Sequence, residues 1–189
     1  MSKVLGLIEA CKRNERKAQA DLYAHFYPPL MALVRKYKHN EEDAASLVND
    51  AFFKVFTNIQ HYKTEMPFEA WIKRITINTV IDEFRKNKKH QGLLKLDDYD
   101  STDFLEMRMV ANDALVEMSV KDIHQLIEKL DEEERVVFNL FEIDGYSHQE
   151  IADTLQVSER TSKRYLASAR NNLKKMLSKV FEAVHMIIL

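Results

Sequence analysis

The chain of 189 residues is poor in glycine, proline and cysteine, and each shortage excludes a class of protein. Glycine and proline occur three times each, which is too few for the tight turns of a β-rich fold, so we expect a mostly helical one. Cys11 is the single cysteine and cannot form an internal disulfide, which suits a reducing cytoplasm. No apolar run approaches the ~20 residues that span a bilayer, and the first residues lack a signal peptide's apolar core. We therefore expect a cytoplasmic protein without membrane insertion.

Catalytic and metal-binding patterns are also missing from the sequence. The seven histidines are scattered, and no cluster of His, Cys and Asp has the spacing of a metal site. There is no glycine-rich loop that could cradle a phosphate. We predict that the chain is not an enzyme and uses no cofactor or metal, which leaves its binding surfaces to carry its function.

Charge is distributed unevenly behind a net value of −2. Residues 1–96 carry 17 basic and 11 acidic side chains, whereas residues 97–118 carry seven acids against Arg108 alone. Residues 158–180 then hold seven bases against Glu159. Two basic regions separated by an acidic segment suggest two contacts with polyanions.

The hydrophobic pattern predicts an all-α protein of two small helical domains joined by a flexible acidic linker. We place the first domain at residues 1–90, the linker at 91–118, the second domain at 119–179 and an apolar tail at 180–189. A kink or break is expected at Pro28-Pro29. The helices predicted in the first domain are Val4–Lys12, Lys17–Tyr37, Glu41–Ile59 and Pro67–Lys88.

The second domain contains a pattern typical of a helix-turn-helix. A capping box starts one short helix at Ser147, and Ser158 caps the next helix after a short turn. Three bases, Arg160, Lys163 and Arg164, stand near the start of that second helix, where a recognition helix meets the major groove. Arginine can bond guanine through two hydrogen bonds, and lysine can bind guanine or phosphate. The alternative is an ordinary amphipathic helix pair with a solvated basic face.

Three stretches of the chain are similar to one protein family. The stretch "EEERVVFNLFEIDGYSHQEIADTLQVSERTSKRYLASARNNL" resembles region four of bacterial RNA polymerase sigma factors. The stretches "EEDAASLVNDAFFKVF" and "MPFEAWIKRITINTVIDEFRK" resemble the two halves of sigma region two. Their order and spacing, without a middle domain, resemble the small extracytoplasmic-function (ECF) class from about Ala20 to Leu177.

Two residues depart from the family pattern in the helix-turn-helix. Gln156 stands where the family usually has a turn glycine. A positive φ at this position would cost a non-glycine residue on the order of 1 kcal/mol. Ser162 replaces an apolar residue that is common at the start of the recognition helix.

One candidate protein interface lies on the helix predicted at Glu41–Ile59. The apolar stripe of this helix faces inward, and four residues fall off it: Asn49, Asp50, Phe53 and Lys54. An exposed Phe with an Asp one turn earlier is the residue mix of a protein interface. Alternatively, Phe53 packs on another helix of the domain. The resemblance implies that this face binds the coiled coil of the polymerase β′ subunit and that Asp50 pairs with an arginine there.

The loop Gln60–Met66 and the helix after it resemble the element that melts the minus-ten promoter region. Flipping a base costs a few kcal/mol, and stacking on an aromatic ring recovers about 1–3 kcal/mol. Tyr62 could provide that ring, Asn78 could bond a base edge, and Trp71 is either a wedge against the duplex or a core residue. Lys73 and Arg74 are predicted to hold phosphates. Arg85 and Lys86 are suited to backbone contacts upstream, or otherwise belong to a solvated helix end.

Together with these patterns, the resemblance implies a promoter-specific transcription initiation factor. It would bind core RNA polymerase through the β′ and β subunits, and it would recognise and melt promoter DNA. By resemblance, the acidic linker would thread toward the RNA channel of the polymerase. A stand-alone helix-turn-helix regulator, or a helical adaptor recruited to DNA through a protein partner, are the alternatives. The tail Val180–Leu189 either folds onto its own domain or docks on another protein, such as an anti-sigma or recruiting factor.

Overall fold

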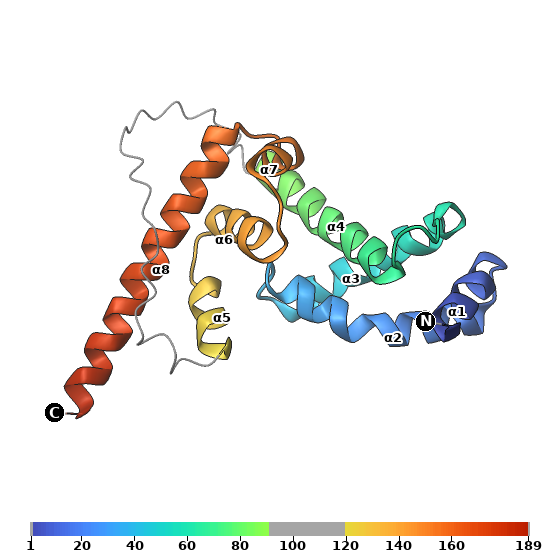
Figure 1. Ribbon diagram of the computed structural model, residues 1–189, viewed down its shortest axis with the longest axis horizontal. Coiled ribbons are helices and arrows are strands. Elements are labelled where there is room, and N and C mark those ends of the chain that lie inside the picture. Colours follow the sequence, from blue (N-terminus) through green and yellow to red (C-terminus); the bar gives the residue numbers. More distant parts are fainter. Residues whose placement is uncertain (1, 91–119, 189) are drawn as a thin grey trace. The chain divides into compact units, whose positions relative to one another are not determined.

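The computed structural model describes residues 2–90 and 120–188, and every regular element in these two ranges is a helix (Figure 1). This confirms the predicted all-α fold. The chain divides into two compact units, residues 1–93 and 94–189. The linker predicted at residues 91–118 lies outside the described residues.

The described residues of the first unit, 2–90, form four α-helices. The side chain of Asn40 starts one of them by accepting the backbone amides of Glu42 and Asp43, as expected of an N-cap. Pro67 directly precedes another and accepts the amides of Ala70 and Trp71. The helices are α1 (Ser2–Lys12), α2 (Arg16–Arg35), α3 (Glu41–Asn58) and α4 (Phe68–His90), with a 3-10 turn, η1 (Ile59–His61), after α3.

Helix α2 runs without a break through Pro28 and Pro29, so the expected interruption is absent. Both prolines lie on the exposed side of the helix, where water can bond the carbonyls that a proline leaves without a partner. On the other side, Phe26, Leu30 and Met31 are buried and hold the helix against the unit. Burial of one face therefore outweighs the cost of two prolines on the other.

The core of the first unit forms where α3 packs against α2 and α4. The apolar stripe predicted on α3 is buried, apart from half-buried Phe56. Phe68 of α4 joins this core through ring contacts with Phe26, at 5.3 Å between centroids, and with Tyr62, at 5.1 Å. The stripe uses one side of α3 only, so the opposite side is free to carry function.

Within residues 120–188, the second unit contains four α-helices and one π-helical turn. Its apolar core includes Ile127, Leu130 and Ala169, with Phe138 and Leu173 packed against it. The elements are α5 (Val120–Glu128), α6 (Glu132–Phe138), the π-helical turn η3 (Asn139–Ile143), α7 (His148–Leu155) and α8 (Glu159–Ile188).

A buried carboxylate fastens α6 to α8. Glu134 accepts hydrogen bonds from the Ser168 hydroxyl at 2.6 Å and from the Asn172 amide at 2.9 and 3.1 Å. Arg135, the next residue, donates to the carbonyls of Glu128 and Leu130 at the end of α5. These directional contacts fix α8 relative to α5 and α6 more specifically than apolar packing alone.

Candidate functional site

The outer side of α3 exposes the aromatic residue that the sequence singled out. Phe53 is 74% exposed, the largest exposed fraction among the large apolar residues that the structure describes as exposed. It therefore does not pack on another helix of its unit, which excludes the alternative considered for it. Asp50, one turn earlier, is exposed too, and among the described residues no side chain pairs with its carboxylate. An apolar side chain and an unpaired carboxylate thus lie next to each other.

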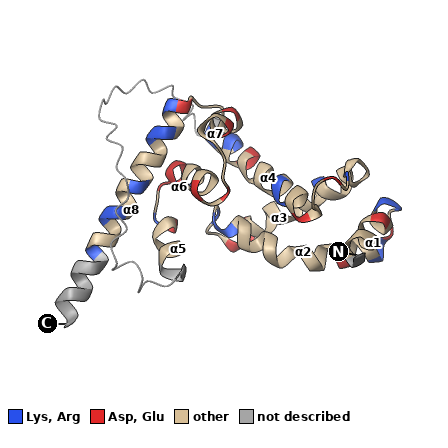
Figure 2. Ribbon diagram, in the orientation of Figure 1, with Lys and Arg blue, Asp and Glu red and all other residues tan. Residues whose placement is uncertain are grey.

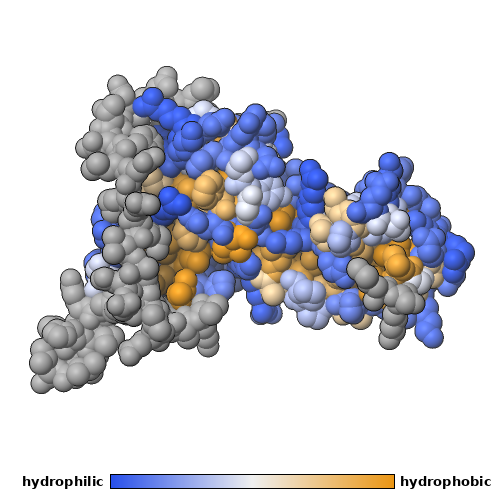
Figure 3. Space-filling model, in the orientation of Figure 1, coloured by the Kyte–Doolittle hydropathy of each residue, from blue (hydrophilic) through white to orange (hydrophobic). Residues whose placement is uncertain are grey.

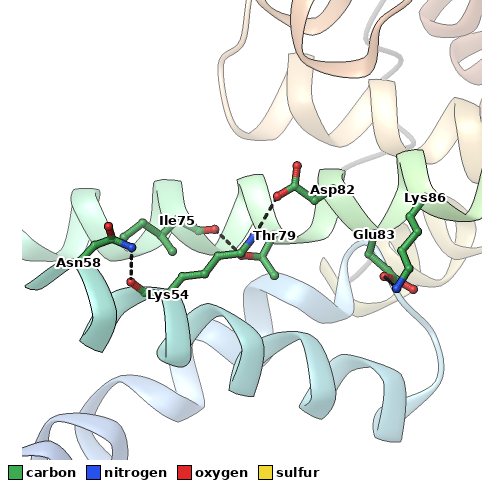
Figure 4. A network of polar contacts seen from close by, with 7 residues as sticks. All are labelled: Lys54, Asn58, Ile75, Thr79, Asp82, Glu83 and Lys86. Carbon is green, nitrogen blue, oxygen red and sulfur yellow. Dashed lines mark hydrogen bonds and ion pairs between the residues drawn. The ribbon is translucent and has the colours of Figure 1, made fainter.

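A shallow hollow of about 250 Å³ continues this face between α3 and α4. The Lys54 ammonium crosses it from α3 to reach Asp82 of α4 at 2.8 Å (Figure 4). Lys86 lies 4.0 Å from Glu83, one turn apart on α4. The hollow is lined by Leu47, Asp50, Phe53, Lys54, Thr79, Asp82, Glu83 and Lys86.

Asn49 has a different environment from its neighbours on α3. Its side-chain oxygen accepts the Tyr23 hydroxyl of α2 at 2.9 Å. Desolvation by burial, followed by the nearby Tyr27, raises the pKa of Tyr23, so this hydroxyl keeps its proton. Asn49 thus ties α3 to α2, and the face that it shares with Phe53 is held in place by an interhelical hydrogen bond.

The predicted base-stacking residue is covered in this structure. Tyr62 is only 5% exposed, and its hydroxyl donates to the Met66 carbonyl at 2.6 Å. Its ring packs against Phe68 and against half-buried Trp71, whose centroid lies 5.2 Å away. A base could stack on Tyr62 only after the loop that carries Met66 moves aside.

The polar residues predicted to contact the minus-ten region divide between two surfaces. At 100° per residue, Trp71, Arg74, Asn78 and Arg85 fall along one side of α4, whereas Lys73 lies about 100° round from Arg74. Arg74, Asn78 and Lys73 are exposed, and Arg85 is half-buried. Lys86, predicted to belong with them, instead lines the hollow between α3 and α4.

The helix-turn-helix in the second unit forms by the predicted local contacts. Ser147 and Glu150 make a complete capping box at the start of α7. Gln156 ends this helix in the left-handed region, with φ of 57°. Ser158 then accepts the amide of Thr161 at 3.0 Å and caps α8. The conditional expectation for Gln156 is met: a non-glycine residue occupies a turn that glycine would make without strain.

Ser162 is fully buried, and its hydroxyl forms a hydrogen bond with His148 Nδ1 at 2.9 Å. The imidazole in turn stacks on Phe141, with ring centroids 4.4 Å apart. Burial, followed by the charge of Lys163, lowers the pKa of His148 below its ordinary 6.5, although Glu159 opposes the shift. Ser162 therefore replaces an apolar contact by a hydrogen bond between the two helices of the motif.

The three predicted DNA-binding bases lie in the first two turns of α8. Arg160 and Lys163 are exposed, and Lys163 lies 3.5 Å from Glu159 on the same helix. Arg164 is half-buried over the ring of Tyr165, at 5.4 Å. Basic residues recur further along α8, up to the part drawn in grey (Figure 2). Of these, Arg170 donates to Glu142 at 2.5 and 2.9 Å and is engaged inside the unit.

Two features of these surfaces were not predicted from the sequence. Asp82 and Glu83 of α4 line the same hollow as Asp50 and Phe53 of α3. His148 forms a hydrogen bond that joins the two helices of the helix-turn-helix. Both depend on contacts between helices, which no spacing within one helix reveals.

Apolar surface is also visible over α5 and α6 (Figure 3), where Ile123 of α5 is partly exposed.

The described part of the chain holds no group of three His, Cys, Asp or Glu side chains arranged to bind a metal ion. Within the same part, no helix has the length and apolar character required to cross a membrane. The geometry is instead that of a helical protein with one mixed apolar and charged face and one basic helix-turn-helix.

These features are those of a protein of the helix-turn-helix class, whose second helix in DNA-binding members enters the major groove. The family model described as "ECF sigma factor" matches residues 1–179, and the chain belongs to this family. It is a transcription initiation factor that binds core RNA polymerase and promoter DNA, as the sequence predicted. Its family consists of transcription regulators rather than enzymes.

Proteins of known identity are similar along most of the chain. ECF RNA polymerase sigma factor SigW of Bacillus subtilis is 29% identical over 178 residues, which cover 90% of this chain and 94% of SigW. RNA polymerase sigma-H factor of Pseudomonas aeruginosa is 25% identical over 180 residues, which cover 90% and 92% of the two chains. A co-crystal structure of the sigma factor RpoE with the anti-sigma factor NepR from Bartonella quintana aligns with a TM-score of 0.48 and 19% identity, covering 84% of this chain and 96% of that one.

Proposed function

We propose that residues 1–90 act as sigma region two and residues 119–179 as sigma region four. In this proposal, the first domain holds core polymerase and melts the minus-ten element, while the second reads the minus-thirty-five element as duplex. The acidic segment 91–118 joins them. The protein acts in the cytoplasm, performs no catalysis itself and leaves RNA synthesis to the polymerase.

The observation that carries this proposal is the exposure of Phe53 beside the unpaired carboxylate of Asp50. A 74% exposed phenylalanine on a well-packed helix is costly in water, and it becomes favourable when a partner covers it. Asp50, Phe53, Asn49 and Lys54 then form the docking face for the polymerase β′ coiled coil. Asn49 fixes α3, and Asp50 pairs with an arginine of the partner.

Melting of the minus-ten element is assigned to one side of α4 and the loop before it. Arg74 and Arg85 contact phosphates, and Asn78 bonds the edge of a flipped base. Because Tyr62 is covered, its ring becomes available only when promoter binding displaces the loop at Met66. Trp71, already half-exposed, is placed to meet the duplex first. Lys73 and Lys86 contribute phosphate contacts from the flanks of this side.

Readout of the minus-thirty-five element is assigned to the start of α8. These bases, Arg160, Lys163 and Arg164, reach base edges or phosphates. Ser158 caps the amino end of the helix, which faces the DNA backbone. Val180–Leu189 continues the backbone of α8 as far as Ile188. Contact of that tail with an anti-sigma or recruiting protein remains a prediction, because its side chains lie outside the described ones.

Reconstituted transcription tests the proposal. Core polymerase with this protein should produce run-off RNA from specific genomic fragments, and core alone should not. With Tyr62→Ala and Asn78→Ala together, RNA from a duplex promoter should fall, whereas RNA from a template already open at the minus-ten position should be retained. An equal loss on both templates would mean that these residues serve folding or core binding, and it would remove them from the melting step.

A further inference from the structure

The hollow between α3 and α4 holds a second carboxylate within reach of the proposed docking face. Three acids line it, Asp50, Asp82 and Glu83, against the two bases Lys54 and Lys86. Lys86 and Glu83 are 4.0 Å apart, which is too long for a hydrogen bond. Lys54 and Asp82 form the only close ion pair across the hollow among the described residues. The lining is thus acidic overall, and its base Lys54 pairs with Asp82 of α4.

The position of Lys54 is informative because another carboxylate is available to it. Asp50 lies four residues earlier on α3, a spacing at which Asp and Lys can pair on one helix. The Lys54 ammonium instead reaches Asp82 at 2.8 Å, although both side chains remain about half exposed, at 41% and 58%. An ion pair so exposed contributes little stability and exchanges readily. Lys54 therefore occupies a site for a cation between α3 and α4, and its ion pair with Asp82 there is weak.

We propose that Asp82 is a second anchor for the arginine of the polymerase that pairs with Asp50, and that Lys54 competes with this arginine for Asp82. A guanidinium has five donors in a rigid plane, so one arginine can bond two carboxylates at once, which a lysine ammonium cannot match in geometry. The aliphatic part of that arginine would lie along Leu47 and Phe53, which line the same hollow. Docking then displaces Lys54 from Asp82. This inference rests on the proposed docking face at Asp50 and Phe53.

Two substitutions with opposite expected signs test the inference. Lys54→Met keeps the aliphatic stem, removes the competitor and should tighten binding of core polymerase by about threefold. Asp82→Asn removes the second anchor and should weaken binding by about tenfold. Both effects should shrink as salt is raised. Arg35→Met is the matched control, since it removes another exposed base of the same unit from an ion pair with Glu41 and should leave affinity unchanged.

The outcomes separate this inference from the proposed function. If Lys54→Met and Asp82→Asn weaken binding equally, the ion pair only organises the two helices and the inference is wrong. If Asp50→Asn weakens binding while Asp82→Asn has no effect, the docking face stands without a second anchor. If neither these variants nor Phe53→Ala changes affinity, both ideas fail together. Should Asp82→Asn lower the melting temperature, Asp82→Glu keeps the charge and must restore binding, and its failure to do so would overturn the inference.

Discussion

The first unit presents an apolar side chain among mixed charges, whereas the second presents bases at the start of a long helix. Phe53 stands out from α3 beside Asp50, next to a hollow lined by both signs of charge. Arg160 and Lys163, in contrast, lie in the first two turns of α8. The difference matches two kinds of partner, because a shaped protein surface needs an apolar anchor and a polyanion needs concentrated positive charge.

The two units also differ in how their working helices are held. In the first unit, α3 is fixed mainly by an apolar stripe, with Tyr23 and Asn49 adding a hydrogen bond at its edge. In the second, buried polar contacts hold α8, notably Glu134 with Ser168 and Ser162 with His148. Directional contacts fix the angle of a helix more strictly than apolar packing. In the proposed function α8 enters the groove of duplex DNA, which has a fixed width, so α8 has the greater need of such contacts.

The largest effect is expected when the docking face of the first unit is removed. Asp50→Ala with Phe53→Ala should weaken assembly with core polymerase by about 1,000-fold, because interface anchors of this kind typically contribute about 2 kcal/mol each. The melting temperature should not change, since both side chains are exposed. Affinity is measured by titrating labelled protein with core. Assembly as tight as that of the natural protein would show that the face has another use.

The matching change in the second unit is Arg160→Ala, Lys163→Ala and Arg164→Ala together. Binding of the holoenzyme to a promoter should fall by roughly 10–100-fold, since one base-specific arginine contributes about 1–3 kcal/mol, and the salt dependence of binding should become shallower. Lys174→Ala with Lys175→Ala is the control, because these exposed bases lie on the same helix several turns further on. Equal losses in both variants would indicate general attraction by α8 rather than readout at its start.

Removal of the buried hydroxyl tests the polar fastening of the helix-turn-helix. Ser162→Ala should destabilise the second unit by about 1–2 kcal/mol, because it leaves His148 Nδ1 without its partner. Ser178→Ala is the control, since Ser178 is exposed and bonds only within its own helix. Urea unfolding followed by circular dichroism reports both units, while fluorescence of Trp71, the single tryptophan, reports the first. A change in the Trp71 transition alone would contradict this assignment.

Replacement of Gln156 by glycine should stabilise the second unit by up to about 1 kcal/mol, because the left-handed conformation is free of strain for glycine. Ala167→Gly, at an exposed position inside α8, should destabilise by about 1 kcal/mol instead. Both substitutions introduce glycine into the same motif, one at a left-handed position and the other inside a helix. Destabilisation by both would mean that the Gln156 side chain contributes contacts that outweigh the strain.

The smallest expected effect concerns pH. The pKa of His148 is lowered in the folded unit by burial and then by Lys163, with Arg170 acting in the same direction and Glu159 opposing. Folding therefore favours the neutral imidazole, so the second unit should lose stability as pH falls through about 6.5 and below. Unfolding midpoints at several pH values should show this slope in the natural protein and a shallower one in His148→Asn. Identical slopes would exclude His148 as the titrating group.

Local features of the fold could be predicted from the sequence, because each depends on residues close in the chain. The α3 stripe, the capping box at Ser147 and the cap at Ser158 follow from helical spacing and side-chain chemistry. The continuity of α2 through Pro28 and Pro29 could not be predicted, since it depends on burial of the opposite face.

The candidate sites were predicted only in part, because they also depend on contacts between helices that are distant in the chain. Exposure of Phe53 follows from its place off the stripe, but the hollow beside it needs α4 to lie against α3. The resemblance pointed to Tyr62, yet its burial is set by Phe68, Trp71 and the carbonyl of Met66. The spacing at Ser162 predicted only a lost apolar contact, because its hydrogen-bond partner His148 lies 14 residues earlier on another helix.

Protection of introduced cysteines tests most directly whether the first unit binds core polymerase and the second binds promoter duplex. The natural Cys11 is buried, and burial with the nearby Glu15 raises its pKa to about 11, so it should not react with a maleimide near neutral pH. Ser46→Cys places a thiol on α3 one turn before Asp50, and Ala167→Cys places one on α8 one turn after Lys163; both positions are exposed. Core polymerase alone should protect the thiol of Ser46→Cys and leave the thiol of Ala167→Cys reactive. The thiol of Ala167→Cys should become protected only when promoter duplex is added. Protection of Ala167→Cys by core alone, with Ser46→Cys still reactive, would contradict the account.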